Sequence, residues 1–154
     1  MSDISWTGGS AQDRKDVLQK YEEYRIANSK CDWEALQTRI LSRDVTFFNM
    51  NGFTYQGHEQ WIRLWQYYFH HIKSGPGPTF DARGQISDDL AVMWLHRRST
   101  LDALTDHPDA TSWPYIGKEF MTRATVVFRR EAEGWRIVHA HFSIGNEGNR
   151  PGGI

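Results

Sequence analysis

The chain lacks the residues and patterns on which several classes of protein depend. Its 154 residues include one cysteine, Cys31, so neither an internal disulfide nor a metal site with two cysteines can form. No apolar run approaches the roughly 20 residues that cross a bilayer, and residues 1–6 lack the charged start and apolar core of a signal peptide. The net charge is -1, and lysine and arginine are spread along the chain without a basic block. We therefore expect a cytoplasmic protein with no nucleic-acid partner and no membrane association.

Aromatic residues, in contrast, are abundant. They make up 14% of the chain and include 7 tryptophans. Each aromatic side chain can bury a large area, so one explanation is the packing of a core. The other explanation is a pocket that binds a flat or hydrophobic ligand, and composition alone does not decide between them.

The hydrophobic spacing and the turn residues predict the order of the elements. Helices are expected at 13–29, 33–41 and 58–71, where apolar residues recur at helical spacing. Strands are expected at 44–50, 79–86, 90–101, 118–131 and 134–143. The remaining segments are expected to be a loose arm at 1–9, a Pro- and Gly-rich helix terminator at 74–78, a long loop at 102–117 and a tail at 145–154.

Helices that precede a run of antiparallel strands indicate an α+β fold, and the length suits one domain over residues 1–154. We expect the sheet to curl around the helices and to leave a cone that is open at one end. The last two strands form a long hairpin around the turn at 133–134.

The last strand alternates between two different faces, because successive side chains on a strand point in opposite directions. One face, expected to be the inner wall of a core or pocket, carries Val138, Ala140, Phe142 and Ile144. The other face carries Trp135, Ile137, His139 and His141. The second face is too apolar for open water and too polar for a plain core, so we expect another subunit to cover it in a homo-oligomer.

The order of elements, together with four stretches, resembles the NTF2-like superfamily, in particular its SnoaL-like and ketosteroid-isomerase-like branches. The stretches are Cys-Asp-Trp-Glu-Ala-Leu at 31–36, Asp-Val-Thr-Phe at 44–47, Gly-His-Glu at 57–59 and Gly-Trp-Arg-Ile-Val-His-Ala-His-Phe-Ser at 134–143. The last stretch also resembles the association domain of calmodulin-dependent kinase II. The resemblance implies a strongly curved mixed or antiparallel sheet wrapped around three N-terminal helices, with a core at about 13–144. The fold hosts enzymes and non-enzymes alike.

The resemblance also implies positions for site residues. The helix-one tyrosine of the ketosteroid isomerases, a hydrogen-bond donor to an oxyanion, falls on Tyr24. Their general-base aspartate falls on Asn49, and their protonated aspartate falls near Ala124. Asn49 cannot take a proton at neutral pH, so a steroid isomerase is not expected and any base must lie elsewhere. Tyr24 is otherwise a core tyrosine, and Asn49 is otherwise a turn residue or a group that positions substrate.

The strand at 90–101 leaves two registers open. If Trp94 faces inward, His96 and Arg98 do so too, and His96 becomes the natural base with Arg98 holding an anion. If the register is shifted by one residue, Leu95 and Arg97 face inward instead. Neither face is uniformly apolar, and a solvated sheet face is a third explanation.

Further candidates, besides Arg98, are expected to bind the substrate. They are Phe47, Trp65, Trp94, Phe142 and His141. His139 and His141 point the same way on a strand and could suggest a metal site. The resemblance places the pocket on the opposite face, however, so we expect no metal.

These candidates predict a cofactor-independent acid–base enzyme, a lyase or isomerase, that acts on a hydrophobic aromatic small molecule. Lignin-derived diaryl compounds are one candidate class of substrate. No phosphate- or dinucleotide-binding loop is present, so we expect no cofactor. The alternatives are a non-catalytic ligand-binding or oligomerisation module and a polyketide cyclase or dehydratase. Whether His96 lines the cone discriminates the enzyme from the binding module.

Overall fold

The computed structural model describes residues 4–152 of the chain. Its helical segments are α1 (Ala11–Lys30), α2 (Trp33–Ala35), the π-helical turn η1 (Leu36–Ile40), α3 (Gly57–Tyr68) and α4 (Pro108–Thr111). Its strands are β1 (Ser5–Gly8), β2 (Leu41–Phe48), β3 (Thr54–Gln56), β4 (Ile72–Ser87), β5 (Leu90–Ala103), β6 (Glu119–Glu131) and β7 (Gly134–Ile144). The predicted α+β class is confirmed.

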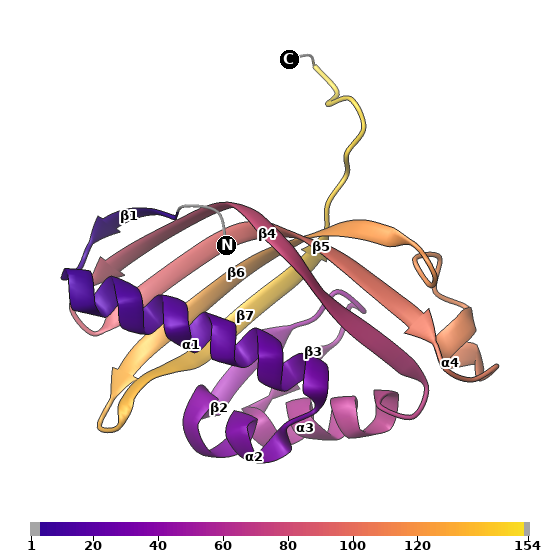
Figure 1. Ribbon diagram of the computed structural model, residues 1–154, viewed down its shortest axis with the longest axis horizontal. Helices are drawn as coiled ribbons and strands as arrows, with labels where there is room; N and C mark the ends of the chain where they lie inside the picture. Colours follow the sequence, from indigo (N-terminus) through magenta and orange to yellow (C-terminus); the bar gives the residue numbers. More distant parts are fainter. Residues whose placement is uncertain (1–3, 153–154) are drawn as a thin grey trace.

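The strands form one curved, mixed sheet in the order β1-β4-β5-β6-β7-β2-β3. β1 pairs in parallel with β4, and β2 pairs in parallel with β7. The central strands β4 to β7 are antiparallel, as the order along the chain predicts. Figure 1 shows α1 lying across one face of the sheet, with α2 and α3 below it and α4 beyond the end of β5.

The sequence of α1 explains where the helix begins and ends. The Ser10 hydroxyl accepts a hydrogen bond from the Asp13 backbone N–H, and the Asp13 carboxylate accepts one from the Ser10 backbone N–H. This reciprocal capping satisfies two N–H groups that the first turn would leave unpaired. At the other end, Cys31 takes a left-handed conformation with φ of 55° and closes the helix. No helix in residues 4–152 is long and apolar enough to span a bilayer.

The main core lies between α1 and the inner face of the sheet. α1 contributes a buried stripe made of Val17, Tyr21, Tyr24 and Ala27. The sheet contributes buried apolar residues from β2 and β4 to β7. A smaller cluster lies at the other end of the sheet, where Ile72, Leu101, Ala110 and Phe120 pack together. Met50 and Trp65 pack against both clusters and so lie between them.

Two segments near the sheet edge differ from the predictions. Residues 5–8 form β1 rather than a loose arm, while residues 1–3 of that arm lie outside the described part. Residues 74–78 do not end a helix, because α3 already ends at Tyr68 and these residues belong to β4. Within residues 4–152, β1 pairs only with residues 83–86 of β4, so the proline-containing part of β4 has β5 as its only sheet neighbour there. Proline is tolerated on such an edge, where no second strand needs its missing N–H.

A bulge in β7 corrects the prediction of an unbroken alternation. Val127 of β6 pairs with His139, whereas the next residue, Phe128, pairs with Ile137. Val138 is therefore left without a partner, and the strand changes face at this point. As a result Trp135 and Ile137 join the buried inner face together with Ala140 and Phe142. Their predicted outward orientation is wrong, and so is the predicted inward orientation of Val138, which is half-buried.

Candidate functional site

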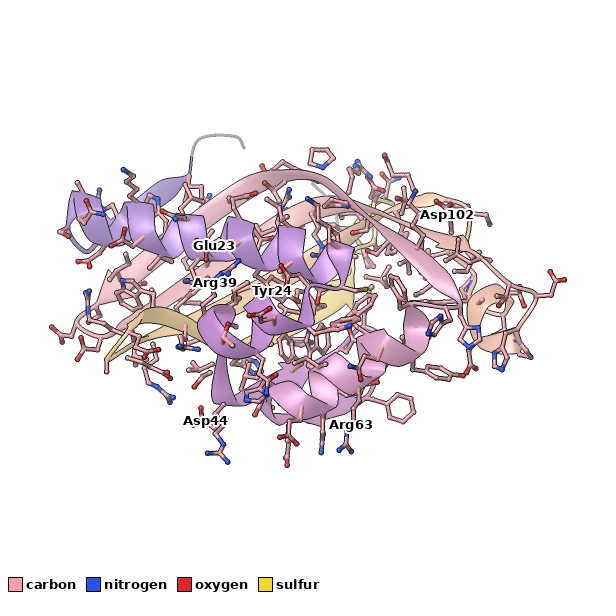
Figure 2. All side chains as sticks on the ribbon, turned by 60° about the horizontal axis from the view of Figure 1, so that its bottom comes forward. Glu23, Tyr24, Arg39, Asp44, Arg63 and Asp102 are labelled. Carbon is pink, nitrogen blue, oxygen red and sulfur yellow. The ribbon has the colours of Figure 1, made fainter. Side chains whose placement is uncertain are left out.

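A cavity lies in the cone between the second half of α1 and the inner face of the sheet. Its walls come from α1, α3, the residues that follow β2, the second half of β5 and Phe142 of β7. Residues 74–77 of β4, here called the Gly-Pro segment, complete the wall. Figure 2 shows Tyr24 in the interior beneath α1, whereas Asp44 and Arg63 lie at the periphery. The hollow measures about 590 Å³ with its open mouth, but the centres of water molecules can occupy only about 40 Å³ of it. One water molecule needs roughly 10–15 Å³ of such space, so the cavity has room for only a few waters.

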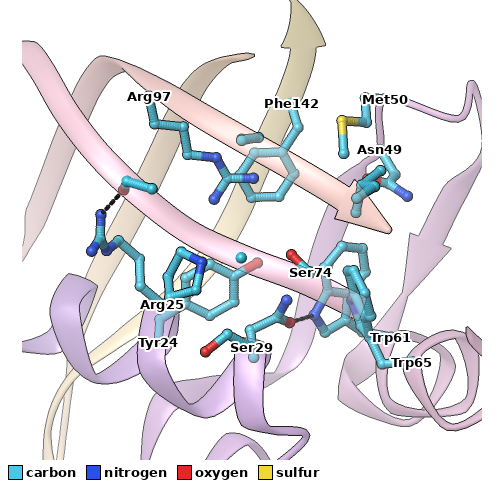
Figure 3. Close-up of a pocket in the computed structure, with 16 residues that line it drawn as sticks. Tyr24, Arg25, Ser29, Asn49, Met50, Trp61, Trp65, Ser74, Arg97 and Phe142 are labelled. Atoms are coloured by element: carbon cyan, nitrogen blue, oxygen red, sulfur yellow. Dashed lines mark hydrogen bonds between the residues drawn. The ribbon is translucent and has the colours of Figure 1, made fainter. Parts of the chain in front are cut away.

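One part of the cavity wall is largely aromatic. Trp61, Trp65, Met50 and Phe142 line it (Figure 3). The ring of Phe47 stacks on Trp61 with centroids 3.8 Å apart and is fully buried behind it. Trp65 and Phe142 thus lie where the sequence predicts contact with a ligand, whereas Phe47 supports the wall and does not line the cavity.

Tyr24 supplies a neutral hydrogen-bond donor. α1 positions it on the buried stripe, where its side chain is 2% exposed. Burial raises the pKa of its hydroxyl well above the usual value, and the positive charge of Arg97 only partly opposes this shift. The hydroxyl remains protonated at neutral pH. Figure 3 shows it facing the cavity, without a hydrogen bond to the other residues drawn there.

Arg97 supplies a positive charge. Its Nε donates a hydrogen bond to Thr122 Oγ1 at 2.9 Å, and its guanidinium carbon lies 5.0 Å from the centroid of the Phe142 ring. No carboxylate in residues 4–152 forms an ion pair with Arg97. Figure 3 shows the Arg97 guanidinium and the Tyr24 hydroxyl reaching into the same space from β5 and α1. The cavity therefore contains a cation without a counter-ion beside a neutral donor.

The second cation of the cavity, Arg25, has partners. Its Nε lies 3.4 Å from Glu22 Oε2, and its Nη1 donates a hydrogen bond to the Gly77 carbonyl oxygen at 3.0 Å. Arg25 thus fastens the Gly-Pro segment of β4 to α1 over the cavity, while Glu22 offsets its charge. We assign Arg25 to the wall rather than to anion binding.

Two asparagines add amide groups. Asn28 Oδ1 accepts a hydrogen bond from Trp61 Nε1 at 2.9 Å, which leaves the amide N–H groups of Asn28 for another partner. Asn49 lines the cavity at the end of β2, as predicted. Its backbone closes the following turn, donating to the Phe53 carbonyl at 3.0 Å and accepting from the Gly52 N–H at 3.0 Å.

The register of β5 settles the alternative that the sequence leaves open. Met93 and Leu95 are buried, and Arg97 follows them on the inner face. His96 therefore lies on the outer face, with its Nδ1 3.3 Å from Asp81 Oδ2 and its ring stacked on Phe80. The hypothesis that His96 lines the cone is wrong, because strand alternation turns it away from Arg97.

Three other candidates also lie outside the cavity. Trp94 is 40% exposed on the outer face of β5. Arg98 pairs with Glu147 at 2.6 Å and lies 3.8 Å from Glu119. His141 is exposed, with its ring edge-on to Phe48 at 5.8 Å. The register of β5 corrects the inward placement of Trp94 and Arg98, whereas His141 lies on the outer face of β7, where the strand alternation predicts it.

None of the residues that line the cavity in the described chain is an aspartate, a glutamate or a histidine. Residues 4–152 also contain no group of three or more histidine, cysteine, aspartate or glutamate side chains that could hold a metal ion. The structure brings together Tyr24, Asn49, Trp65 and Phe142 from the predicted set. Arg97 was named only as an alternative, and Asn28, Trp61 and the Gly-Pro segment were missed because their approach depends on contacts between distant segments.

Comparisons with known proteins agree on the family and the fold. The family model for the SnoaL-like domain matches residues 17–147. A Salmonella enterica protein of the NTF2-like superfamily superposes with a TM-score of 0.71 at 15% identity, covering 95% of this chain and 100% of that one. An uncharacterised cystatin-like fold protein from Caulobacter vibrioides gives a TM-score of 0.70 at 17% identity, with 89% and 92% covered.

A third solved structure is that of a proposed dehydratase of the NTF2-like family from Streptomyces avermitilis, with a TM-score of 0.69 at 16% identity and 88% and 97% of the two chains covered. At these identities the structures show the fold alone. No curated protein sequence matches the chain. The family model covers most of the chain, from α1 to the end of β7. The chain therefore belongs to the SnoaL-like family and has the NTF2-like fold.

Proposed function

We propose that the protein binds a small, flat anion in the cone, with the negatively charged group at Arg97 and Tyr24 and the apolar body against Trp61 and Trp65. The observation that carries this proposal is that Arg97, which lies among aromatic walls, forms no ion pair with any carboxylate of residues 4–152. A partly buried guanidinium loses hydration that no carboxylate of the described chain replaces. An anionic ligand would supply the missing charge, and Tyr24 would donate a hydrogen bond to the same group.

The walls support an aromatic or otherwise planar body. Trp61, Trp65 and Phe142 present flat apolar surfaces on one side of Arg97. The narrow volume suits a single ring. A diaryl compound of the lignin-derived kind would fit only if the cavity widened.

The second candidate is a cofactor-free enzyme of the isomerase, cyclase or dehydratase type on the same aromatic class of substrate. Family membership is consistent with such an activity as well as with a ligand-binding role. Tyr24 and Arg97 favour it, because donors aimed at one oxygen stabilise an oxyanion that develops in a transition state. Among the described residues, the cavity walls offer no carboxylate or imidazole to accept a proton, so the base would have to come from the substrate or from water. This shortage is why we place binding first.

Calorimetric titration with benzoate and cinnamate, and with the corresponding neutral amides, tests the proposal. The acids should bind and the amides should bind at least about tenfold more weakly, since a hydrogen bond to a charged group contributes about 1.5–3 kcal/mol. Arg97→Gln should remove this preference. Arg98→Gln is the matched control, because Arg98 is the next residue and lies on the outer face with Glu147. Equal binding of acids and amides, or an unchanged Arg97→Gln variant, would contradict the proposal.

Turnover separates the two candidates. Any bound compound is incubated with the protein and followed by NMR over time, with Tyr24→Phe and His96→Ala alongside. Consumption by the wild type and by His96→Ala, but not by Tyr24→Phe, supports the enzyme. Binding without consumption by any of the three supports the binding module.

A further inference from the structure

Two buried hydroxyl groups lie beside Arg97, and one of them, that of Ser99, also belongs to the cavity wall. Thr122 on β6 is fully buried, and Ser99 on β5 is 7% exposed. Thr122 Oγ1 lies 2.9 Å from Arg97 Nε, 3.0 Å from Ser99 Oγ and 3.5 Å from the Arg97 carbonyl oxygen. One hydroxyl oxygen therefore contacts Arg97 at both its side chain and its backbone.

The chemistry of the donors fixes the direction of the bond that matters for Arg97. Arg97 Nε can only donate, so Thr122 Oγ1 must accept from it. The single Thr122 proton can go to Ser99 Oγ at 3.0 Å or to the Arg97 carbonyl oxygen at 3.5 Å. In the second case Ser99 donates to Thr122. In both cases Thr122 accepts from Nε, so the Arg97 side chain is held in one orientation.

This orientation restricts how Arg97 can meet a ligand. A guanidinium can bind a carboxylate side-on, through Nε and one Nη, or end-on, through the two Nη atoms. Thr122 already occupies Nε, so only the end-on arrangement is left. Phe142 also covers the guanidinium at 5.0 Å. Two parallel N–H groups fit the paired oxygens of a carboxylate, whereas a phenolate or enolate offers a single oxygen.

We infer that Thr122, supported by Ser99, is a positioning residue that makes the cone selective for planar carboxylates over single-oxygen anions. The inference rests on the proposed function, since it names the chemical class of the anion at the same site. A positioning role for Thr122 predicts that its loss changes the ratio of the affinities for the two kinds of anion. A structural Thr122 would affect the unfolding temperature and leave the ratio of two affinities unchanged.

The test compares pentafluorobenzoate with pentafluorophenolate, which share a ring and are both ionised near neutral pH. Fluorine NMR and calorimetry report their binding to the wild type, Thr122→Val, Thr122→Ser and Arg97→Lys. The wild type should favour the benzoate, by about tenfold for one additional charged hydrogen bond. Thr122→Val and Arg97→Lys should lose most of this preference. Thr122→Ser, which keeps the hydroxyl, should retain it.

The outcomes keep the two proposals apart. If neither anion binds the wild type, the proposed function fails. If both anions bind and the wild type shows no preference, or Thr122→Val keeps the preference, the proposed function stands and the positioning role is overturned. Circular dichroism checks that Thr122→Val is folded. If it is not, Ser99→Ala and Arg97→Lys decide, because Ser99→Ala removes the hydroxyl that contacts Thr122 and should lower the preference in part.

Discussion

The hydroxyl of Tyr21 should cost the protein stability. Tyr21 lies one turn before Tyr24 on α1 and is fully buried. Its hydroxyl makes no hydrogen bond of normal geometry in the described chain, although the Arg97 side chain lies close enough to interact weakly with it, and burial raises its pKa, so the group stays neutral. A buried polar group left unpaired costs about 1–3 kcal/mol.

Tyr21→Phe should therefore raise the free energy of unfolding. The gain should be about 1 kcal/mol, at the low end of the range, because the lost oxygen leaves a small void and the nearby charge of Arg97 already interacts with the hydroxyl. Tyr24→Phe is the matched control. It removes the same atom from the same helix, but that atom faces the cavity, where water can solvate it. Its effect should stay within about 0.5 kcal/mol.

Urea unfolding followed by far-UV circular dichroism measures both variants. The midpoints can be compared directly if the slope m is unchanged. A Tyr21→Phe variant that is less stable by about 1 kcal/mol would refute the reasoning, since it would mean that the hydroxyl is paired in solution. An equal gain for Tyr24→Phe would refute it as well, because the environment of the hydroxyl would then not matter.

Two further predictions concern the β4 wall and the first helix. Gly77→Ala should lower the melting temperature and weaken anion binding, because the new Cβ would overlap the Arg98 carbonyl oxygen of the paired strand β5. Gly75→Ala should lower the melting temperature less, because the Cβ at that position meets only the Thr100 side chain. Thermal melts that rank the two variants in the opposite order would contradict this prediction. Asp13 accepts hydrogen bonds from Arg130 and Ser10, which lower its pKa from 3.8 to about 2. The ionised Asp13 carboxylate therefore stabilises the folded protein above about pH 4, and this contribution is lost as the pH falls toward 2. Asp13→Asn should melt at a lower temperature than the wild type at neutral pH, and the difference in melting temperature should shrink as the pH falls from about 4 to about 2. A difference that stays constant would exclude ionisation of Asp13 as the cause.

Local signals in the sequence predicted several elements well. The helix expected at 13–29 is α1, extended by two residues at its start and one at its end. The hairpin expected at 118–131 and 134–143 is β6 and β7. These predictions succeed because helical spacing, capping residues and turn residues act over a few positions. The resemblance to the NTF2-like superfamily supplied the arrangement of these elements in space.

Contacts between distant segments account for what could not be predicted. β1 forms only because residues 5–8 find a free edge beside residues 83–86 of β4. The Gly-Pro segment has strong turn signals, and β5 overrides them by pairing with it. The bulge at Val138 is set by the partner strand β6. No pattern within a single segment contains this information.

The register of β5 matters most for function. Both faces of this strand carry charged or ionisable residues after Leu95, so the usual rule that the apolar face turns inward does not choose between His96 and Arg97. The choice is made by pairing with β6, which sets Leu95 opposite Ala124 and Met93 opposite Val126, all of them buried. An inward imidazole would have placed a base of suitable pKa in the cone. A guanidinium cannot give up its proton at neutral pH and so cannot act as a base. It can only attract and orient negative charge, and this one-residue difference moves the favoured function from proton transfer to the recognition of an anion.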